Sequence, residues 1–220
     1  MNMADEQQSP INIENAIYAE LGDAGLSIEW TGELHGHIEQ GDHGLKVVFP
    51  SDFRQYVKLG GKVFHLRQFH FHHPSEHWVD GQQHSMELHI VHQNASDGSL
   101  AVIGVFLEPG KGAAADSVGH LLTALSAADA NGDAKPEVPT DPHEYLPKTW
   151  KEHYRYEGSL TTDPYSENVS WVVVRDPLEL PKKEFAKLLS LFKAEARFPL
   201  PRNRRFILKT FDPPKAAKKK

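Results

Sequence analysis

The spacing of histidines in two short stretches restricts the fold of this chain more than any other feature. Residues 68–72 read QFHFH, and residues 87–92 read ELHIVH. Successive side chains of a β-strand point to opposite faces of a sheet, so His70 and His72 share one face while the two phenylalanines share the other. The first stretch therefore predicts a strand that places two imidazoles side by side.

A third imidazole reaches the same face if a strand that carries His89 lies beside the first. Glu87 and Val91 would then share the face of His89, because each is two residues away from it. Neutral imidazole suits zinc, and three protein ligands with an open fourth position distinguish a catalytic zinc site from a closed structural one. The pattern predicts one Zn²⁺ held by His70, His72 and His89, with water in the fourth position.

The chain has 14 histidines, so most of them must have other roles. An isolated histidine in a strand is more often a hydrogen-bonded structural residue than a metal ligand. His73 and His92 point to the opposite face from the predicted ligands, which excludes both from the site. We also treat His77 and His84 as residues that do not bind the metal.

Length and charge restrict the class of protein. The 220 residues suit one domain with a sizeable core, and we expect it to cover residues 1–213. The 30 acidic and 24 basic side chains give a net charge of −6, which provides no electrostatic footprint for nucleic acid. Residues 214–220 are basic, and we expect a disordered, solvated tail there.

Cysteine is absent, so a metal must be held by histidine or carboxylate, and a disulfide framework is excluded. The longest apolar run, residues 100–107, is too short to span a bilayer. The polar start of the chain lacks the apolar segment of a signal peptide. We therefore expect neither a membrane span nor a signal peptide in this chain.

Strand patterns outnumber helical patterns along the chain. Apolar side chains at helical spacing predict helices around residues 118–125 and 185–192, the second beginning after Pro181. Residues 130–148 are rich in Pro, Asp and Gly, which is typical of a loop. The predicted strands, rich in β-branched and aromatic residues, are residues 45–49, 63–72, 84–92, 100–107 and 171–175.

Taken in order, these and other short segments resemble one family, the α-class carbonic anhydrases, and its bacterial branch in particular. The resemblance implies a mainly β (α+β) single domain, with a twisted, mostly antiparallel sheet of about ten strands and a few peripheral helices. It also implies reversible hydration of carbon dioxide to bicarbonate and a proton, by attack of zinc-bound hydroxide. The matching segments are residues 8–13 (QSPINI), 68–72, 75–77 (SEH), 87–92, 101–107, 158–162 (GSLTT), 169–171 (VSW) and 203–204 (NR).

The same resemblance assigns residues that support the ligands and orient the hydroxide. It implies that Gln68 supports His70, that Glu87 accepts the free ring N–H of His89, and that Asn203 belongs to the same supporting group. Thr161 would accept a hydrogen bond from the hydroxide and donate its own proton to Glu76. An ionised carboxylate can only accept, which fixes that direction.

Carbon dioxide is apolar, so a hydrophobic wall beside the metal suits it. The resemblance points to five residues for this wall, although plain core packing is the other reading for Val169 and Trp171. The five residues are Val91, Val102, Leu160, Val169 and Trp171.

Regeneration of the hydroxide requires a route for the proton to solvent, and an imidazole titrates in the suitable range. His43 falls where the resemblance places the proton shuttle. An exposed loop histidine without a role is the alternative reading, and His35 and His37 are nearby substitutes.

The resemblance also implies sulfonamide and anion inhibitors, weak esterase activity, and a homodimer as one option. It suggests a periplasmic or secreted protein, whereas the missing signal peptide and cysteines leave a cytoplasmic location open. Two other readings are a catalytically silent relative that serves as a binding module and a structural zinc domain. The complete ligand set disfavours the first, and the lack of a fourth protein ligand on the same face disfavours the second.

Overall fold

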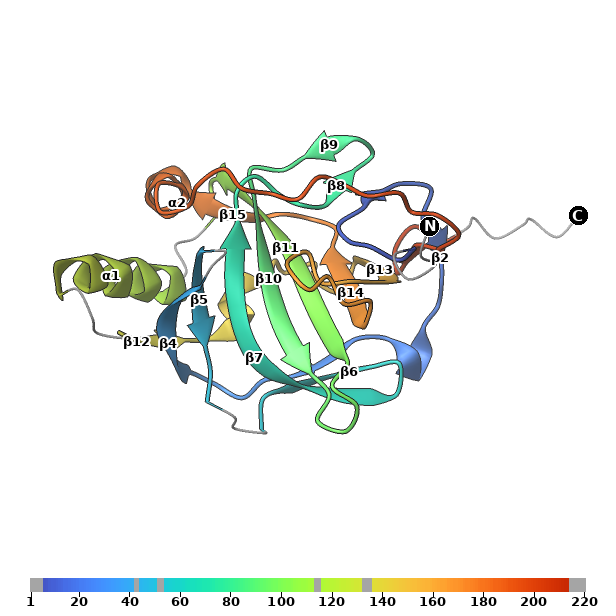
Figure 1. Ribbon diagram of the computed structural model, residues 1–220, viewed down its shortest axis with the longest axis horizontal. Coiled ribbons are helices and arrows are strands. Elements are labelled where there is room, and N and C mark those ends of the chain that lie inside the picture. Colours follow the sequence, from blue (N-terminus) through green and yellow to red (C-terminus); the bar gives the residue numbers. More distant parts are fainter. Residues whose placement is uncertain (1–5, 42–43, 51–53, 113–115, 132–135, 214–220) are drawn as a thin grey trace, which may run out of the picture.

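A large twisted sheet forms the body of the protein, as the computed structural model shows (Figure 1). The structure describes residues 6–41, 44–50, 54–112, 116–131 and 136–213. His43 and the basic tail therefore lie outside the described residues.

Within the described residues, the main sheet contains 13 strands, ten of which follow one another across it. Most neighbouring strands in this sheet are antiparallel. The exceptions are β14 and β15, which pair in parallel with β11, and β2, which pairs in parallel with β16. Across the sheet the order is β12 (Glu137–Thr140), β4 (Leu34–Gly41), β5 (Gly44–Val48), β7 (Lys62–His72), β10 (Met86–Gln93), β11 (Leu100–Gly110), β14 (Val169–Val174), β13 (His153–Gly158), β16 (Leu208–Lys209) and β2 (Ile17–Tyr18).

Shorter elements complete the fold. Three strands pair beside this path, and three others form a small separate sheet. The former are β3 (Ser27–Glu29), β6 (Tyr56–Leu59) and β15 (Leu178–Pro181), and the latter are β1 (Asn12–Ile13), β8 (Trp78–Val79) and β9 (Gln82–Gln83). The helices are α1 (Asp116–Asn131) and α2 (Lys182–Leu189), with 3₁₀ turns η1 (Gly22–Ala24) and η2 (Pro142–Tyr145).

The predicted fold class is confirmed, including the mostly antiparallel sheet and the few helices. The five predicted strands correspond to β5, β7, β10, β11 and β14, with small shifts at their ends. The sheet has more strands than expected because several strands are only two to four residues long. Segments of that length are too short to show a readable alternation of apolar and polar residues.

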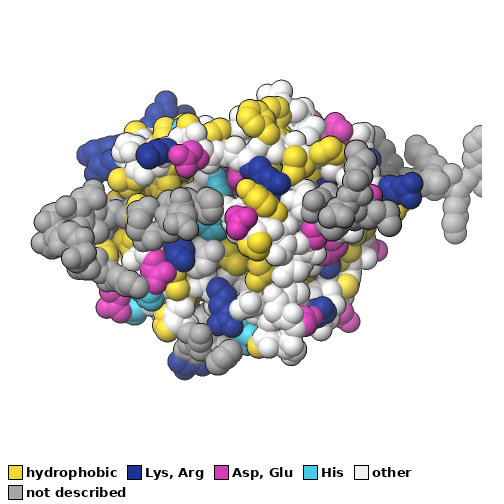
Figure 2. All heavy atoms as spheres, viewed as in Figure 1, with side chains coloured by type: hydrophobic (Ala, Val, Ile, Leu, Met, Phe, Trp, Pro, Cys, Tyr) yellow, Lys and Arg dark blue, Asp and Glu magenta, His cyan; other side chains and the backbone are white. Residues whose placement is uncertain are grey.

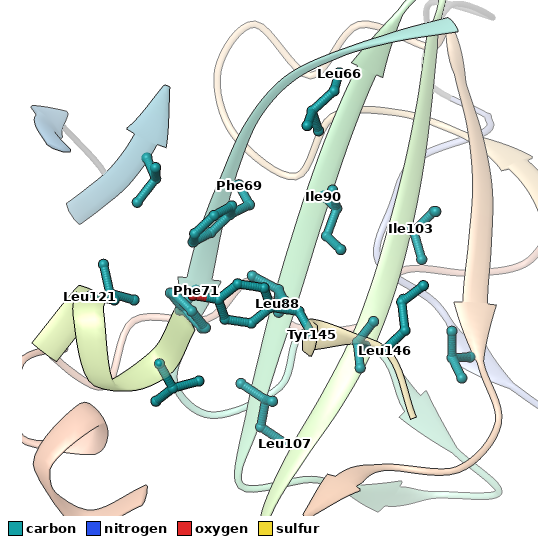
Figure 3. Close-up of a cluster of buried hydrophobic side chains, with 14 of the residues drawn as sticks. Leu66, Phe69, Phe71, Leu88, Ile90, Ile103, Leu107, Leu121, Tyr145 and Leu146 are labelled. Carbon is teal, nitrogen blue, oxygen red and sulfur yellow. The ribbon is translucent and has the colours of Figure 1, made fainter. Parts of the chain in front are cut away.

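The two faces of the central strands carry separate apolar clusters. Phe69, Phe71, Leu88, Ile90 and Ile103 point to one face and pack into the larger cluster (Figure 3). Both helices cover this face and contribute buried side chains to it. His70, His72 and His89 point to the opposite face, where the smaller cluster lies.

One segment differs from its predicted structure. Residues 130–148 were expected to form a loop, but they contain β12 and η2. Strand β12 is an edge strand that pairs only with β4, so Pro139 interrupts no central ladder. This strand forms through its pairing with β4 and not through an alternation of apolar and polar residues in its own sequence.

Both predicted helices are present, and Pro181 directly precedes α2 as predicted. The second helix ends at Leu189, so Phe192 of the predicted apolar stripe lies just beyond it. Its ring nevertheless packs against Phe71, with ring centroids 5.5 Å apart. None of the helices in the described residues has the length and apolarity that a membrane span requires.

Charged side chains of both signs are interspersed on the face seen in Figure 2. Among the described residues on this face, neither sign forms a continuous patch. This face therefore offers no basic footprint for nucleic acid.

Two glycines allow a direct test of packing in this fold. A Cβ atom at Gly36, in β4, would lie 2.5 Å from Cγ1 of Val47, whereas a Cβ at Gly119, in α1, would meet nothing within 4 Å. We expect Gly36→Ala to lower the free energy of unfolding by about 1–3 kcal/mol through overpacking. Gly119→Ala is expected to raise it by about 0.5–1 kcal/mol, because alanine favours the helix. Urea unfolding of both variants at equal zinc concentration checks this, and equal midpoints would contradict it.

Candidate metal centre

The register of three strands builds the histidine site. His70 on β7 lies directly opposite His89 on β10, and His72 lies opposite Glu87. Residues that oppose each other in neighbouring strands share a face, so these four side chains gather on one side of the sheet. On the far side of β10, His89 is opposite Gly104 of β11.

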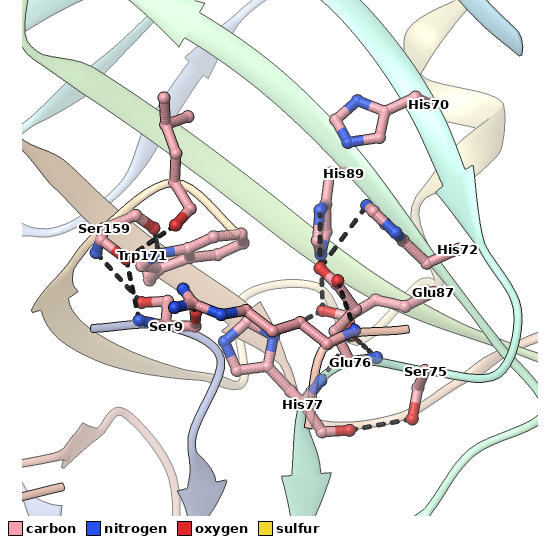
Figure 4. A network of polar contacts seen from close by, with 12 residues as sticks. Ser9, His70, His72, Ser75, Glu76, His77, Glu87, His89, Ser159 and Trp171 are labelled. Carbon is pink, nitrogen blue, oxygen red and sulfur yellow. Dashed lines mark hydrogen bonds and ion pairs between the residues drawn. The ribbon is translucent and has the colours of Figure 1, made fainter. Parts of the chain in front are cut away.

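Three imidazoles converge in this place (Figure 4). The ring centroids are 4.9 Å apart for His70 and His72, 5.3 Å for His70 and His89, and 4.5 Å for His72 and His89. One ligand-type nitrogen from each ring lies within 4.8 Å of the others. His72 and His89 are buried, and His70 is half-buried.

The remaining contacts of the rings indicate which nitrogens are available. Nδ1 of His70 lies 2.9 Å from Oε1 of Gln68, so Nε2 is the nitrogen of this ring that could bind a metal. Nε2 of His89 lies 3.0 Å from Oε1 of Glu87, a close contact whose angles are not those of a hydrogen bond, and this leaves Nδ1. Nε2 of His72 is buried without a hydrogen-bond partner among the described residues. A buried, unpartnered imidazole nitrogen beside two others fits a zinc ion, for which imidazole is a usual ligand.

Glu87 supports the triad from behind. Its Oε2 accepts the backbone N–H groups of Glu76 at 2.9 Å and His77 at 2.8 Å. Its Oε1 lies 2.7 Å from Nδ1 of His77, besides the contact with His89. Burial alone would raise the pKa of Glu87, but His77 and His89 hold that pKa well below its usual range. Glu87 is therefore an ionised acceptor, and the nitrogens that face it carry protons.

The same arrangement shifts the pKa values of His89 and His72 in opposite directions. Burial lowers the pKa of His89, but the carboxylate of Glu87 more than offsets this, so the pKa is raised. Burial, followed by the neighbouring His89 and His70, lowers the pKa of His72 well below its usual value. A neutral imidazole is the form that binds a metal, so a cation at the triad would replace a proton on Nδ1 of His89, while Nε2 keeps the proton that faces Glu87.

A second group of three residues, His77, Glu87 and His89, also lies within reach of a common ion. The oxygens of Glu87 are already occupied by the N–H groups of this cluster, however. These contacts engage Glu87 in hydrogen bonding and leave the three histidines as the candidate metal ligands.

A cavity of about 390 Å³ opens beside the triad. Glu76 lies at its inner end, with Oε2 3.5 Å from Nε2 of His72 and 4.0 Å from Nδ1 of His89. Burial raises the pKa of Glu76, while His89, the hydroxyl of Thr161 and the N–H of Arg197 act to lower it. The residues that line the cavity are His72, Glu76, Thr161, Thr162, Tyr165, Glu195, Ala196 and Arg197.

Next to His89, apolar side chains form a continuous row across the strands. Val91 opposes Val102 of β11, which in turn opposes Trp171 of β14. The ring of Trp171 meets that of His89 edge-on, with centroids 4.8 Å apart. These three residues and Val169 are buried in one cluster, and Leu160 packs against it. The structure thus brings the five predicted wall residues together on the metal side of the sheet.

Sequence reasoning did not identify a buried chain of hydrogen bonds behind Glu87. His77 lies with Nε2 2.6 Å from the hydroxyl of Tyr156, and that hydroxyl lies 2.9 Å from Oγ of Ser9. Ser9 and Ser159 are joined twice, by Ser9 N–H to Ser159 Oγ at 2.9 Å and by Ser159 N–H to Ser9 Oγ at 3.1 Å. The supporting carboxylate is therefore linked to the segment that leads to Thr161.

The remaining predicted residues lie further from the triad or outside the description. Asn203 is exposed, with a positive φ of 55°, and its amide donates to the carbonyl oxygen of Glu6 at 2.7 Å. Its role in supporting the ligands stays a prediction. His35 and His37 lie on β4, with ring nitrogens 3.3 Å from Glu137 and 3.2 Å from Glu39, respectively.

This geometry can hold one divalent cation with three imidazoles. It presents the cation to a cavity that contains a carboxylate and a hydroxyl, and it lines the adjoining side with apolar groups. A site of this kind is suited to activating a water molecule against a small, weakly polar substrate.

Comparison with known proteins agrees with this geometry. A family model described as eukaryotic-type carbonic anhydrase matches residues 1–212. The chain is 33% identical over 203 residues to a carbonic anhydrase from Nostoc sp., covering 92% of this chain and 75% of that protein.

Solved structures of bacterial proteins are similar as well. The α-carbonic anhydrase of Photobacterium profundum superposes with a TM-score of 0.77 at 33% identity, covering 92% of this chain and 89% of that one. The α-carbonic anhydrase of Thermovibrio ammonificans, solved in complex with the inhibitor sulfanilamide, gives a TM-score of 0.73 at 33% identity, covering 93% and 87%. The chain therefore belongs to the eukaryotic-type, or α-class, carbonic anhydrases, which are zinc-dependent lyases.

Proposed function

We propose that this protein interconverts carbon dioxide and bicarbonate with one zinc ion held by His70, His72 and His89. The observation that carries the proposal is the convergence of three imidazole nitrogens within 4.8 Å beside a cavity. Carbonic anhydrases are the standard example of the chemistry that zinc supplies: it lowers the pKa of bound water from 15.7 to about 7, so that a nucleophile exists at neutral pH. The three histidines bind the ion as neutral ligands, and Gln68 and Glu87 fix the orientation of two of the rings.

Thr161 orients the attacking oxygen in this proposal. Its side chain is 7% exposed and lines the cavity together with Glu76. The hydroxyl of Thr161 donates its hydrogen bond to the carboxylate of Glu76, so the threonine oxygen can only accept a hydrogen bond from the attacking group. Thr161 therefore favours an attacking oxygen that carries a proton. The N–H of Arg197, 3.1 Å from Oε1 of Glu76, favours the ionised form of that carboxylate.

The apolar row gives carbon dioxide a place beside the triad. Val91 and Trp171 flank His89, and neither Val91 nor Val102 offers a polar group that would hold water there. A substrate without hydrogen-bond donors gains more from such a wall than from polar groups. Bicarbonate is charged and is less well accommodated there, which favours its release after the reaction.

Stopped-flow hydration of carbon dioxide tests the proposal. Protein loaded with one zinc per chain is expected to be active, to lose activity with a chelator, and to regain it on addition of zinc. His89→Ala is expected to lose zinc and activity together, because it removes one of three ligands. His120→Ala, which changes an exposed histidine on α1, is the matched control and should keep both. Full activity in metal-free protein, or retained zinc with full activity in His89→Ala, would contradict the proposal.

Thr161→Ala separates metal binding from orientation. The variant is expected to keep its zinc but to lower kcat/KM about 10²-fold, because a misplaced attacking group costs about that much. Thr161→Ser retains a hydroxyl and should recover most of the activity. Zinc content by atomic absorption and initial rates of hydration are the measurements. An unchanged rate in Thr161→Ala would show that this hydroxyl does not orient the reaction.

The route of the proton to solvent is proposed to include His43. His43→Ala is expected to slow turnover mainly in weak buffer, with rescue by added imidazole, because an external base then carries the proton. His35→Ala and His37→Ala are the matched controls, since both histidines lie on β4 and each has a carboxylate neighbour. Buffer dependence in one of these two variants instead of His43→Ala would transfer the role to that residue.

Sulfonamide binding follows from the same proposal. The Thermovibrio relative was solved with sulfanilamide, and the ligand set proposed here would present a zinc ion to such an inhibitor. A nucleophile of this kind would also attack activated esters weakly. The complete triad, Glu76 and Thr161 favour an enzyme over a silent binding module, and the open cavity disfavours a purely structural zinc site.

A further inference from the structure

Tyr165 has an unusual backbone conformation at the mouth of the cavity. Its φ is +57°, in the left-handed region that bulky residues rarely adopt. It closes the turn after Thr161, donating its N–H to the carbonyl oxygen of Thr162 at 2.8 Å, and its side chain is 38% exposed. A strained residue of this type, held beside a functional site, suggests that its side chain has a role there.

The ring of Tyr165 lies under the guanidinium group of Arg197. The central carbon of that group is 4.0 Å from the ring centroid, well within the range of a cation–π contact. Nη1 of Arg197 also donates to Oε1 of Gln8 at 3.0 Å and to the carbonyl oxygen of Ser9 at 2.7 Å. Both the ring and these two acceptors therefore fix the position of Arg197.

The backbone of Arg197 in turn contacts the catalytic carboxylate. Its N–H donates to Oε1 of Glu76 at 3.1 Å. Glu76 is the group that we propose accepts a hydrogen bond from the hydroxyl of Thr161. A displacement of Arg197 would thus be transmitted to Glu76 and to the hydroxyl that depends on it.

Gln8 connects Tyr165 and Arg197 by a second set of contacts. Its Nε2 donates to the carbonyl oxygen of Tyr165 at 3.1 Å and to Oε1 of Glu167 at 3.0 Å, while its Oε1 accepts from Arg197. Three segments far apart in the sequence are therefore joined around the cavity. The turn contributes a side chain to this network of contacts through the ring of Tyr165.

We infer that Tyr165 is a positioning residue for the hydration reaction: its ring holds Arg197, which holds Glu76 and Thr161 in their working arrangement. This inference rests on the proposed function, since it concerns the same site. Tyr165 touches neither the metal ligands nor the reacting atoms in the proposal. Its effect is on the geometry of the hydroxyl side of the cavity and not on metal binding.

Two substitutions at position 165 isolate the ring face from other effects. Tyr165→Leu removes the aromatic face but keeps an apolar side chain, and Tyr165→Phe keeps the ring without the hydroxyl. Both retain a Cβ, so the backbone strain at this position is matched. Tyr56→Leu is a control at a remote site, because Lys58 lies over the ring of Tyr56 at 5.9 Å on β6.

Zinc-loaded Tyr165→Leu is expected to show a kcat/KM about fivefold below that of the wild type, the size of one half-exposed cation–π contact. Zinc content and the midpoint of the pH profile should not change, so that the height of the plateau falls, and the melting temperature should fall by no more than about 2–4 °C. Tyr165→Phe should recover the rate to within about twofold, and Tyr56→Leu should match the activity of the wild type. A general loss of stability would instead lower the melting temperature further or lower the zinc content.

Amide hydrogen exchange followed by NMR gives a measurement that does not depend on activity. Two hydrogen-bonded amides report on this network of contacts. The N–H of Leu160 donates to the carbonyl oxygen of Ser166 at 3.0 Å, and the N–H of Arg197 donates to Oε1 of Glu76. Both should exchange about tenfold faster in Tyr165→Leu than in Tyr165→Phe. The amide of Asn94, which donates to Ser99 at 2.8 Å in a distant turn, should be unaffected.

Equal rates and equal exchange in Tyr165→Leu and the wild type would overturn the inference while leaving the proposed function intact. A fall in rate of the same size in Tyr56→Leu would also overturn it, because the effect would not belong to the cavity. Inactive wild-type protein that holds one zinc would refute the proposed function. In that case the exchange rates of Leu160 and Arg197 would still decide whether the ring orders the turn.

Discussion

A fully buried carboxylate determines how the site is built. Glu87 has no solvent exposure, and an unpaired charge in such a place would be very costly. Two backbone N–H groups and two imidazoles surround it. One of those N–H groups belongs to Glu76, so pairing the buried charge also fixes the backbone that presents Glu76 to the cavity. The support of His89 and the placement of the Glu76 backbone thus follow from one requirement.

The same carboxylate explains a glycine in the middle of the sheet. A Cβ at Gly104 would lie 2.8 Å from Oε1 of Glu87, and Gly104 is directly opposite His89. Glycine usually weakens a strand, because it adds chain entropy and packs no side chain. Here its small size leaves room for the charge, and β11 is stabilised by buried neighbours on both sides.

The metal side of this structure could be predicted from sequence because it depends on periodicity. The alternation in β7 and β10 places His70, His72 and His89 on one face, and their convergence follows once the two strands pair. The exclusion of His77 as a ligand stays a prediction, and its contact with Glu87 was not foreseen. His77 lies in the irregular segment between two strands, where no period indicates the direction of a side chain. Tyr156 lies in β13, and its contact with Ser9 was not foreseen because only the folded chain brings these distant residues together.

The two halves of the site differ in how far along the chain their partners lie. The three candidate ligands fall between residues 70 and 89 and meet through two strands paired in one register. The hydroxyl half depends on contacts between distant segments, such as that of Gln8 with Tyr165, which are 157 residues apart. Closing such a contact requires nearly the whole chain, whereas the ligand strands can pair as soon as both exist. The histidine half of the site therefore needs only a short loop of chain to close, whereas the hydroxyl half draws on segments far apart in the chain and depends on the completed fold.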